Sequence, residues 1–309
     1  MSAGWVAAGV RGQGLAHRRL GHDGARSLAA SESLAAALAT LLRTPYGREV
    51  RADMDLATAQ HAVAATLLWH LRILAGWAPS LRSGSLRLMA AGFEISNVTG
   101  HVARLGGRPA PAPYALGSLA MAWPTVSVAR TPAEVRTALR SSAWGDPGGD
   151  DLPIVGLALQ FGWARQVFDG VPEAADWAVS GAALVLARVV ALGALPALSR
   201  SARGDISRVL GPRWQQAASL GELARYLPRP AALALRGVDG AEDLWRAEVR
   251  WWASVESAGA VLAARPPRGP SSCVGVAALL AADAWRTRAA LVMAAGGGGE
   301  LAEVLDAVA

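Results

Sequence analysis

The sequence predicts an all-α protein, and composition and periodicity both support this class. Apolar residues make up 52% of the 309 residues, with alanine the commonest, while Phe and Tyr occur only three times each. Ala, Leu and Arg are good helix formers, and the apolar residues recur at i, i+3 and i+4 over long windows. The length allows one large domain or two ordinary ones, with enough residues to bury a core.

Helical patterns follow one another along the chain with little sign of strands. Apolar periodicity, polar caps such as Asp55 and glycine or proline stops predict helices over residues 5–27, 33–43, 55–77, 85–105, 132–141, 152–168, 173–192, 219–227, 241–263, 274–295 and 300–308. Proline-rich residues 108–116 and 265–270 predict linkers or crossing segments, and 296–300 predict a glycine hinge.

A short capped helix recurs in the sequence. "TPAEVRTAL" from Thr131 to Leu139 and "SLGELARYL" from Ser219 to Leu227 each place Glu three residues after Thr or Ser, which is the pattern of a capping box. An earlier copy, "SLAAALATL" from Ser33 to Leu41, has Ala36 in place of the Glu. Recurrence in one frame indicates a repeated structural unit.

Two of these short helices also end alike. "TLLRTPYGREV" (residues 40–50) and "ALRSSAWGDPG" (residues 138–148) each close on small residues, an aromatic residue and a glycine. The pairs are Tyr46–Gly47 and Trp144–Gly145, and each glycine lies where a left-handed residue commonly ends a helix. A catalytic loop has no reason to occur twice, so the recurrence favours a structural role.

The repeats predict one domain over residues 1–309 with pseudo-threefold internal symmetry. Each short helix follows a long one if the C-terminal helix pairs with the first short helix. The predicted repeats are residues 1–84 completed by 271–309, residues 85–170, and residues 171–270. We therefore expect three helical repeats that form a funnel-like array closed through the two chain ends.

Charge and hydropathy indicate a soluble or peripheral protein. All 30 basic residues are arginine, and the net charge of +6 permits contact with anionic headgroups or an acidic partner. The sequence contains neither aromatic residues interleaved with basic clusters nor a recognition motif, so it does not predict nucleic-acid binding. Residues 1–20 lack the apolar core of a signal peptide, and the charge-free stretch 109–129 contains four prolines, which exclude a continuous membrane helix. Residues 177–199 are interrupted by Arg188 and Pro196, so we interpret them as buried core.

No residue pattern predicts catalysis, a metal site or a cofactor. The five histidines lack metal-ligand spacing, Cys273 has no evident base partner, and "GVRGQGLAHRRLG" is not a phosphate-binding loop. Without a signal peptide, the glycosylation sequon at Asn97 is interpreted as chance. Glu94 and Asn97 lie one turn apart on one predicted helix, where they form either an inter-domain contact or a solvated polar face.

At this point the sequence resembles a known family. "GFEISNVTGHVARLGG", then "PYALGSL", then "ARTPAEVRTALRSSAWG" resemble the C-type subunit of archaeal and bacterial A/V-type rotary ATPases, which corresponds to the d-type subunit of the eukaryotic V-type enzyme. The residues that match the family pattern are Glu94, Ile95, Asn97, Arg104, Tyr46, Gly47, Trp144, Gly145, Asp283 and Arg288. Gly181 and Arg286 depart from it, since they stand near positions where the other copies would hold Asn.

The resemblance implies a non-catalytic part of an ion-transporting or proton-transporting ATPase. In that family three helical domains form a funnel that receives the tip of the central stalk and sits on the membrane ring of proteolipid subunits. We therefore expect a peripheral protein at the cytoplasmic face of the cell membrane, with central-stalk subunits of the D and F type and the proteolipid ring as partners. Arg104 and Arg108 are the candidates for contact with the ring. The alternative is a free-standing helical scaffold or small-molecule-binding protein of the same fold.

Overall fold

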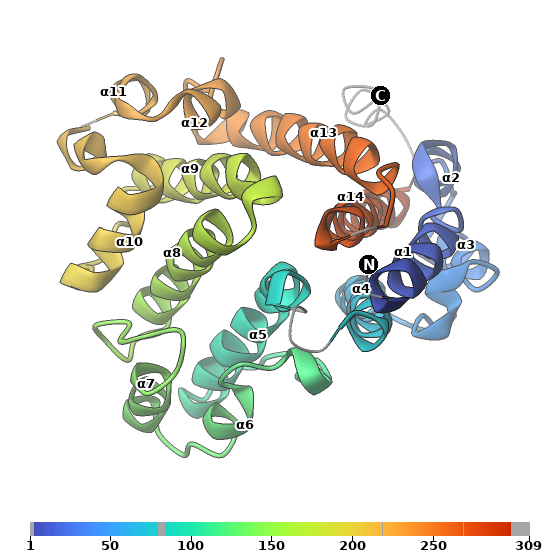
Figure 1. Cartoon of the computed structure of the whole chain (residues 1–309), viewed down its shortest axis with the longest axis horizontal. Helices are drawn as coiled ribbons and strands as arrows, with labels where there is room; N and C mark the ends of the chain where they lie inside the picture. The colour runs from blue at the N-terminus through green and yellow to red at the C-terminus, as the bar shows by residue number, and fades with distance from the viewer. Residues whose placement is uncertain (1–2, 80–83, 218, 268, 298–309) are drawn as a thin grey trace. The chain divides into compact units, whose positions relative to one another are not determined.

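The computed structural model describes residues 3–79, 84–217, 219–267 and 269–297, and every regular element within those ranges is a helix (Figure 1). The prediction of an all-α protein is therefore confirmed. The chain divides into two compact units, each described below by itself. Unit 1 comprises Met1–Leu86 and Trp252–Ala309, and unit 2 comprises Arg87–Trp251.

Unit 1 is built around one long central helix from the C-terminal part of the chain. Helix α14 (Pro270–Ala295) packs against three N-terminal helices, α1 (Ala3–Ala16), α2 (Gly21–Ala29) and α4 (Leu56–Trp77), as Figure 1 shows. Helix α3 (Leu34–Leu41) and the 3-10 turn η1 (Pro45–Arg48) complete the unit, together with the C-terminal part of α13 (Leu244–Ala263). Residues on most sides of α14 are buried, which explains its lack of a polar face.

Unit 2 follows the chain without interruption and contains two apolar clusters. Its elements are α5 (Gly84–Leu105), η3 (Gly117–Leu119), α6 (Trp123–Val126), α7 (Pro132–Arg140), α8 (Leu152–Gly170), η4 (Pro172–Ala174), α9 (Ala175–Ala191), α10 (Arg200–Leu210), η5 (Pro212–Gln216), α11 (Leu220–Tyr226), α12 (Arg229–Ala234), η6 (Ala241–Asp243) and the start of α13. One cluster joins α5–α8, and the other joins α8–α13. The two clusters lie within the second and third predicted repeats, while the threefold funnel stays a prediction.

The three predicted helix caps are confirmed. The hydroxyls of Ser33, Thr131 and Ser219 each accept a hydrogen bond from the backbone N–H three residues later, at 3.2–3.3 Å. Such a bond satisfies one of the donors that the first turn of a helix leaves free. The carboxylate of Glu134 accepts the N–H of Arg130, one residue before the cap, which is a shifted form of the predicted capping box.

Several predicted helices need correction. The predicted helix 5–27 is wrong, because α1 ends at Ala16 and α2 starts at Gly21, whose φ of 72° breaks the helix. Helices α6, α10 and α12 were not predicted, and the predicted helix 241–263 begins with the 3-10 turn η6. The predicted helix 300–308 lies outside the described residues.

Among the described residues, one helical segment, Pro172–Ala191, is long and apolar enough to cross a membrane. Half of it is buried in the protein, so it is weak support for a membrane span.

Candidate functional site: two buried carboxylate junctions

Glu94 joins α5 to the start of α6. Its side chain lies on the face of α5 that is buried, and the residue is only 1% exposed. The carboxylate accepts hydrogen bonds from the backbone N–H groups of Met121, Ala122 and Trp123, the first of these at 2.8 Å. Backbone donors at the start of a helix are the natural partners of a carboxylate, because they are unpaired and carry partial positive charge. We call this arrangement the Glu94 junction.

Asn97 lies one turn further along α5 and fixes the segment that leads to α6. Its amide nitrogen donates to the carbonyl of Tyr114 at 2.9 Å, and its amide oxygen accepts the N–H of the same residue at 2.7 Å. Asn97 is buried, so the solvated polar face considered for Glu94 and Asn97 is wrong. The hydrogen-bond partners named here for both side chains lie within unit 2, and the buried amide of Asn97 is unavailable to a glycosylating enzyme in the folded protein.

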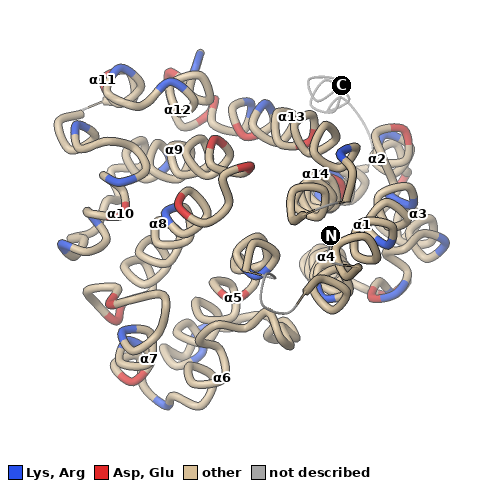
Figure 2. Tube along the Cα trace, viewed as in Figure 1, with Lys and Arg blue, Asp and Glu red and all other residues tan. Residues whose placement is uncertain are grey.

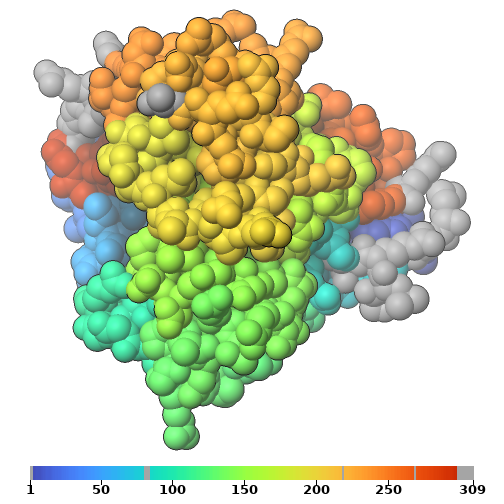
Figure 3. Space-filling model, turned by 90° about the vertical axis from the view of Figure 1, so that its left-hand side faces the viewer, coloured from blue at the N-terminus to red at the C-terminus, as the bar shows by residue number. Residues whose placement is uncertain are grey.

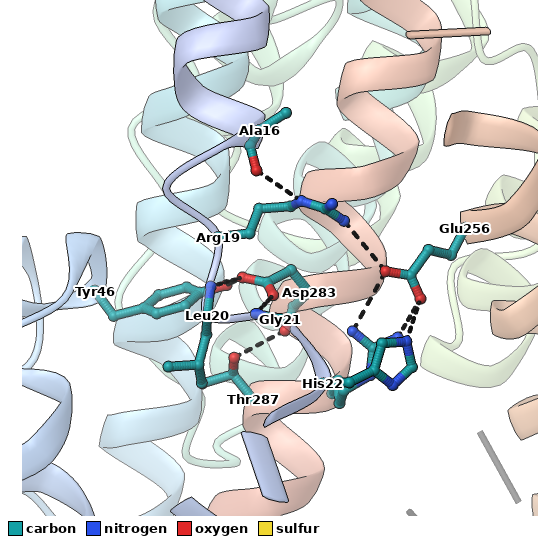
Figure 4. Close-up of polar contacts among 10 residues, drawn as sticks. Ala16, Arg19, Leu20, Gly21, His22, Tyr46, Glu256, Asp283 and Thr287 are labelled. Atoms are coloured by element: carbon teal, nitrogen blue, oxygen red, sulfur yellow. Dashed lines mark hydrogen bonds and ion pairs between the residues drawn. The ribbon is translucent and has the colours of Figure 1, made fainter. Parts of the chain in front are cut away.

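Asp283 makes a corresponding junction in unit 1 (Figure 4). It is 2% exposed on α14, and its carboxylate accepts the N–H groups of Leu20 and Gly21, at 3.1 and 2.8 Å, at the start of α2. The hydroxyl of Tyr46 donates to the same carboxylate at 2.8 Å. Burial and the neighbouring Asp283 carboxylate raise the pKa of Tyr46 well above its usual value, so the hydroxyl is a donor at physiological pH. We call this arrangement the Asp283 junction.

The two junctions share the order of their parts. In unit 1, a buried carboxylate on α14 holds the start of α2, and the capped helix α3 follows. In unit 2, a buried carboxylate on α5 holds the start of α6, and the capped helix α7 follows. The third predicted repeat departs from this order. The only carboxylate of α9, Asp176, is exposed, and the buried hydroxyl of Ser180 donates instead to the carbonyl of Pro230 at 3.2 Å.

The turns that follow α3 and α7 also have the same hydrogen bonds. Thr44 donates its hydroxyl to the carbonyl of Leu41 at 2.7 Å and accepts the N–H of Tyr46 at 3.2 Å. Ser142 donates to Leu139 at 2.7 Å and accepts the N–H of Trp144 at 3.1 Å. The similar endings noted in the sequence therefore correspond to one local structure.

The aromatic and glycine residues of these turns differ in detail. The Trp144 indole nitrogen is buried with no hydrogen-bond partner in the described structure, whereas the Tyr46 hydroxyl reaches Asp283. Gly145 has a φ of 77°, as the sequence predicts, but Gly47 lies inside η1 and is not left-handed. Position 47 has no room for a side chain, because a Cβ there would lie 2.3 Å from the carbonyl oxygen of Leu42.

A second polar cluster lies beside the Asp283 junction (Figure 4). Glu256 on α13 accepts from Arg286 on α14 and forms ion pairs with Arg19 at 3.1 Å and His22 at 3.3 Å. Burial acts to raise the pKa of Glu256, but the hydrogen bond and charge of Arg286, with His22 and Arg19, hold it below its usual value. Arg286 is 2% exposed, so its charge depends on this partner. The cluster and the Asp283 junction together hold residues 19–22, which include the end of the link from α1 and the start of α2.

The remaining predicted site residues lie near the surface or in the core. Arg104 donates to the carbonyl of Pro111 at 2.8 Å, and Arg108 is exposed just beyond α5. Arg288 is exposed on α14, where its carbonyl accepts the side chain of Gln60 at 3.5 Å. Ile95 belongs to the apolar cluster of α5–α8. The structure therefore brings Tyr46 and Asp283 together, and Glu94 and Asn97 onto one buried face, but it does not unite the predicted residues in one site.

Sequence reasoning did not identify Glu256, Arg19 or His22. Arg286 was noted only as a departure from the family pattern, although a charged residue within an apolar helix is itself a signal that a buried partner is needed. Glu256 lies within the helix predicted over residues 241–263, and nothing in the local pattern indicates a partner for its carboxylate. No local spacing connects residue 19 to residue 256, so this cluster could not be found by reading along the chain.

The junctions are suited to fixing helices rather than to chemistry. Their carboxylate oxygens accept hydrogen bonds from backbone N–H groups and, at Asp283, from the hydroxyl of Tyr46. No group of three or more potential metal ligands occurs among the described residues. A shallow depression in unit 2 is lined by Trp144, Asp146, Ser201 and Asp205 among others. There burial raises the pKa of Asp205, against the opposing effect of Arg165, with which it forms an ion pair at 2.6 Å.

Comparison with known proteins does not assign this chain to a family. No protein-family model matches the chain, and no curated protein matches it.

Proposed function

We propose that this protein is a non-catalytic adapter of a V/A-type rotary ATPase, which couples rotation of the central stalk to the membrane ring of proteolipid subunits. In this proposal the three helical repeats form a funnel at the cytoplasmic face of the membrane. Its partners are central-stalk subunits of the D and F type and the proteolipid ring, and the process served is ion or proton transport.

The recurrence of one buried junction in both units carries this proposal. A carboxylate on a long helix holds the start of a short helix, and a capped helix with a Thr or Ser turn follows. One copy is assembled from the two ends of the chain, as the repeats in the sequence lead us to expect. A part that transmits torque must resist deformation, and buried carboxylates bonded to backbone donors limit the movement of the helices they join.

Affinity purification from native membranes tests the proposal. The tagged chain is purified from its own organism in mild detergent, and the bound proteins are identified by mass spectrometry. We expect central-stalk, proteolipid and catalytic ATPase subunits in the complex. A chain recovered alone from the cytosol would overturn the rotary role and favour the free-standing scaffold.

Charge reversal at the predicted contact with the ring refines this test. Arg108→Glu is expected to reduce recovery of proteolipid subunits, because Arg108 is exposed and its charge is free to face a partner. Arg140→Glu, which reverses an exposed charge at the end of α7, is the matched control. Equal recovery with both variants would remove Arg108 from the contact without affecting the identification of the partners.

A further inference from the structure

Positive charge is concentrated in one part of unit 2. Residues 200–236 contain seven arginines and two carboxylates, so this stretch carries +5 of the chain's net charge of +6. It comprises α10, η5, α11 and α12, which carry several of the blue segments in Figure 2. In Figure 3 the yellow and orange surface of this stretch faces the viewer. The charge balance alone suggests contact with an anionic partner.

Most of these arginines have no carboxylate partner. Within the described structure, Arg208 is the one arginine of the stretch that forms an ion pair, with Asp169 at 3.0 Å. Arg203 donates to the carbonyl of Leu198 at 2.8 Å, and Arg213 lies over the ring of Tyr226 at 4.4 Å. Carbonyls and rings orient a guanidinium group but do not neutralise it, so the positive charge stays available at the surface.

Helix α12 presents these charges together with an apolar side chain. Arg229 and Leu233 are exposed one turn apart on α12, with Leu233 45% exposed, and Arg236 is exposed in the turn that follows the end of the helix at Ala234. The opposite face, which includes Ala231 and Leu235, is buried in the cluster shared with α9. Arg250 on α13 donates to the carbonyl of Arg236 at 2.7 Å and adds a fourth exposed side chain. We call Arg229, Leu233, Arg236 and Arg250 the α12 face.

The chemistry of the α12 face fits a phospholipid surface better than a nucleic acid. A single-stranded nucleic acid would be bound through free aromatic rings, but Tyr226 is covered by Arg213 and Trp214 is buried. Guanidinium groups around one exposed leucine match the boundary of an anionic bilayer, where phosphates lie above the acyl chains. The exposed carboxylates of Asp239 and Glu242 follow α12 in the chain and would lie at the edge of such a contact.

We propose that the α12 face binds an anionic phospholipid headgroup layer, with the three arginines on phosphate groups and Leu233 inserted shallowly between headgroups. This inference goes beyond the proposed function, because an adapter held only by protein contacts would not need it. It also depends on different residues from the predicted contact at Arg108.

Vesicle co-sedimentation of the isolated full-length chain tests the inference. We expect binding to vesicles that contain phosphatidylglycerol but not to vesicles of phosphatidylcholine alone, and we expect rising salt to weaken it. The triple variant Arg229→Glu, Arg236→Glu, Arg250→Glu should bind at least about 100-fold more weakly, because each basic residue near the surface contributes about 1 kcal/mol, which is roughly fivefold in binding. The control triple Arg43→Glu, Arg72→Glu, Arg140→Glu has the same net charge but alters exposed arginines elsewhere, and should lose much less.

A second variant separates lipid binding from simple charge attraction. Leu233→Gln leaves the charge unchanged and should weaken binding to anionic vesicles while leaving binding to a soluble polyanion such as polyglutamate unaltered. Arg229→Gln with Arg236→Gln gives a milder test if the charge reversals affect folding, which circular dichroism would reveal. Three outcomes would each overturn the inference. The two triple variants could lose vesicle affinity equally, or Leu233→Gln could bind vesicles as well as the wild type does. The third is a protein that binds polyglutamate but not vesicles. Vesicle binding by the isolated chain is independent of the membrane purification, so either proposal can fail alone.

Discussion

The hydroxyl of Tyr46 donates a hydrogen bond of 2.8 Å to the carboxylate of Asp283, which lies 237 residues later in the chain. Both residues are buried, and the same carboxylate accepts two backbone N–H groups where α2 begins. One side chain therefore holds three segments of unit 1, namely η1, the start of α2 and α14. Substitution of Tyr46 and substitution of Asp283 should therefore lower the free energy of unfolding by different amounts.

Tyr46→Phe should lower the free energy of unfolding by about 1–3 kcal/mol, because it removes one hydrogen bond to a charged acceptor. Asp283→Asn should cost more, since the amide places donor hydrogens against backbone donors. Urea unfolding of both single variants and of the double variant forms a thermodynamic cycle. The two changes should couple by more than about 0.5 kcal/mol, as residues in one hydrogen-bond network do. Strict additivity would contradict the Asp283 junction.

Glu94→Gln should destabilise the protein by about 3 kcal/mol, because the carboxylate accepts three backbone N–H groups and an amide cannot replace it. Glu134→Gln is the matched control, since Glu134 is an exposed residue that accepts one N–H group at the start of α7. Glu134→Gln should lower the free energy of unfolding by less than about 1 kcal/mol. Chemical denaturation at pH 7 measures both. Similar losses would mean that burial of Glu94 contributes little.

The glycines that end the two matching turns should respond to alanine for different reasons. Gly145→Ala should cost about 1–2 kcal/mol, because its φ of 77° is unfavourable for a residue with a Cβ while the space around it is open. Gly47→Ala should cost more, since the Cβ would meet backbone atoms of Leu42 that cannot move independently. Thermal unfolding of both variants measures the difference. The reverse order would show that the 3-10 turn η1 adjusts readily.

His70 should make stability depend on pH in a defined window. Burial, with the nearby charges of Arg18 and Arg48, lowers the pKa of His70 from its usual 6.5 to about 4. The unfolded chain therefore binds a proton at a higher pH than the folded chain, so stability is complete above about pH 6.5 and falls as the pH drops toward 4.

The size of this effect can be isolated with one substitution. The wild-type protein should lose up to about 3 kcal/mol more than His70→Gln between pH 7 and pH 4, at about 1.4 kcal/mol for each unit of pKa difference. His61→Gln is the control, because His61 has a lowered pKa but is less buried. Unfolding curves at several pH values measure the effect. Parallel pH profiles for the wild type and His70→Gln would contradict the burial of a neutral imidazole.

The sequence is most informative where structure depends on nearby residues. The caps at Ser33, Thr131 and Ser219 are local hydrogen bonds, and the helices that they start were predicted to within a residue or two. The break after α1 was missed although Gly21 is a local indication of it, and the carboxylate of Asp283 that accepts the N–H groups of Leu20 and Gly21 is distant in the sequence. The periodicity of residues 5–27 is helical on both sides of this break, so the apolar pattern alone does not locate it.

The roles of the candidate residues were predicted less well than their positions. Glu94, Asn97, Tyr46 and Asp283 were selected from a family pattern, and the structure shows each as a buried side chain with hydrogen-bond partners. Their partners could not be predicted, because Glu94, Asn97 and Asp283 all bond to backbone groups. Those of Glu94 and Asn97, at residues 114 and 121–123, lie in segments without regular periodicity. Backbone donors have no sequence signature, so a carboxylate that depends on them looks like any polar residue on a helix.

The division of unit 1 between the two ends of the chain has a consequence during synthesis. Residues 1–86 leave the ribosome before any of α14 exists, and the whole of unit 2 is translated before Trp252 appears. At about 5–20 residues per second, the N-terminal helices wait roughly ten to forty seconds for the helix that covers their apolar faces. During that interval Leu28, Leu38 and Leu41, which are buried in the finished protein, lack the apolar side chains that α14 adds to their cluster, so the nascent chain exposes apolar surface that the finished protein buries.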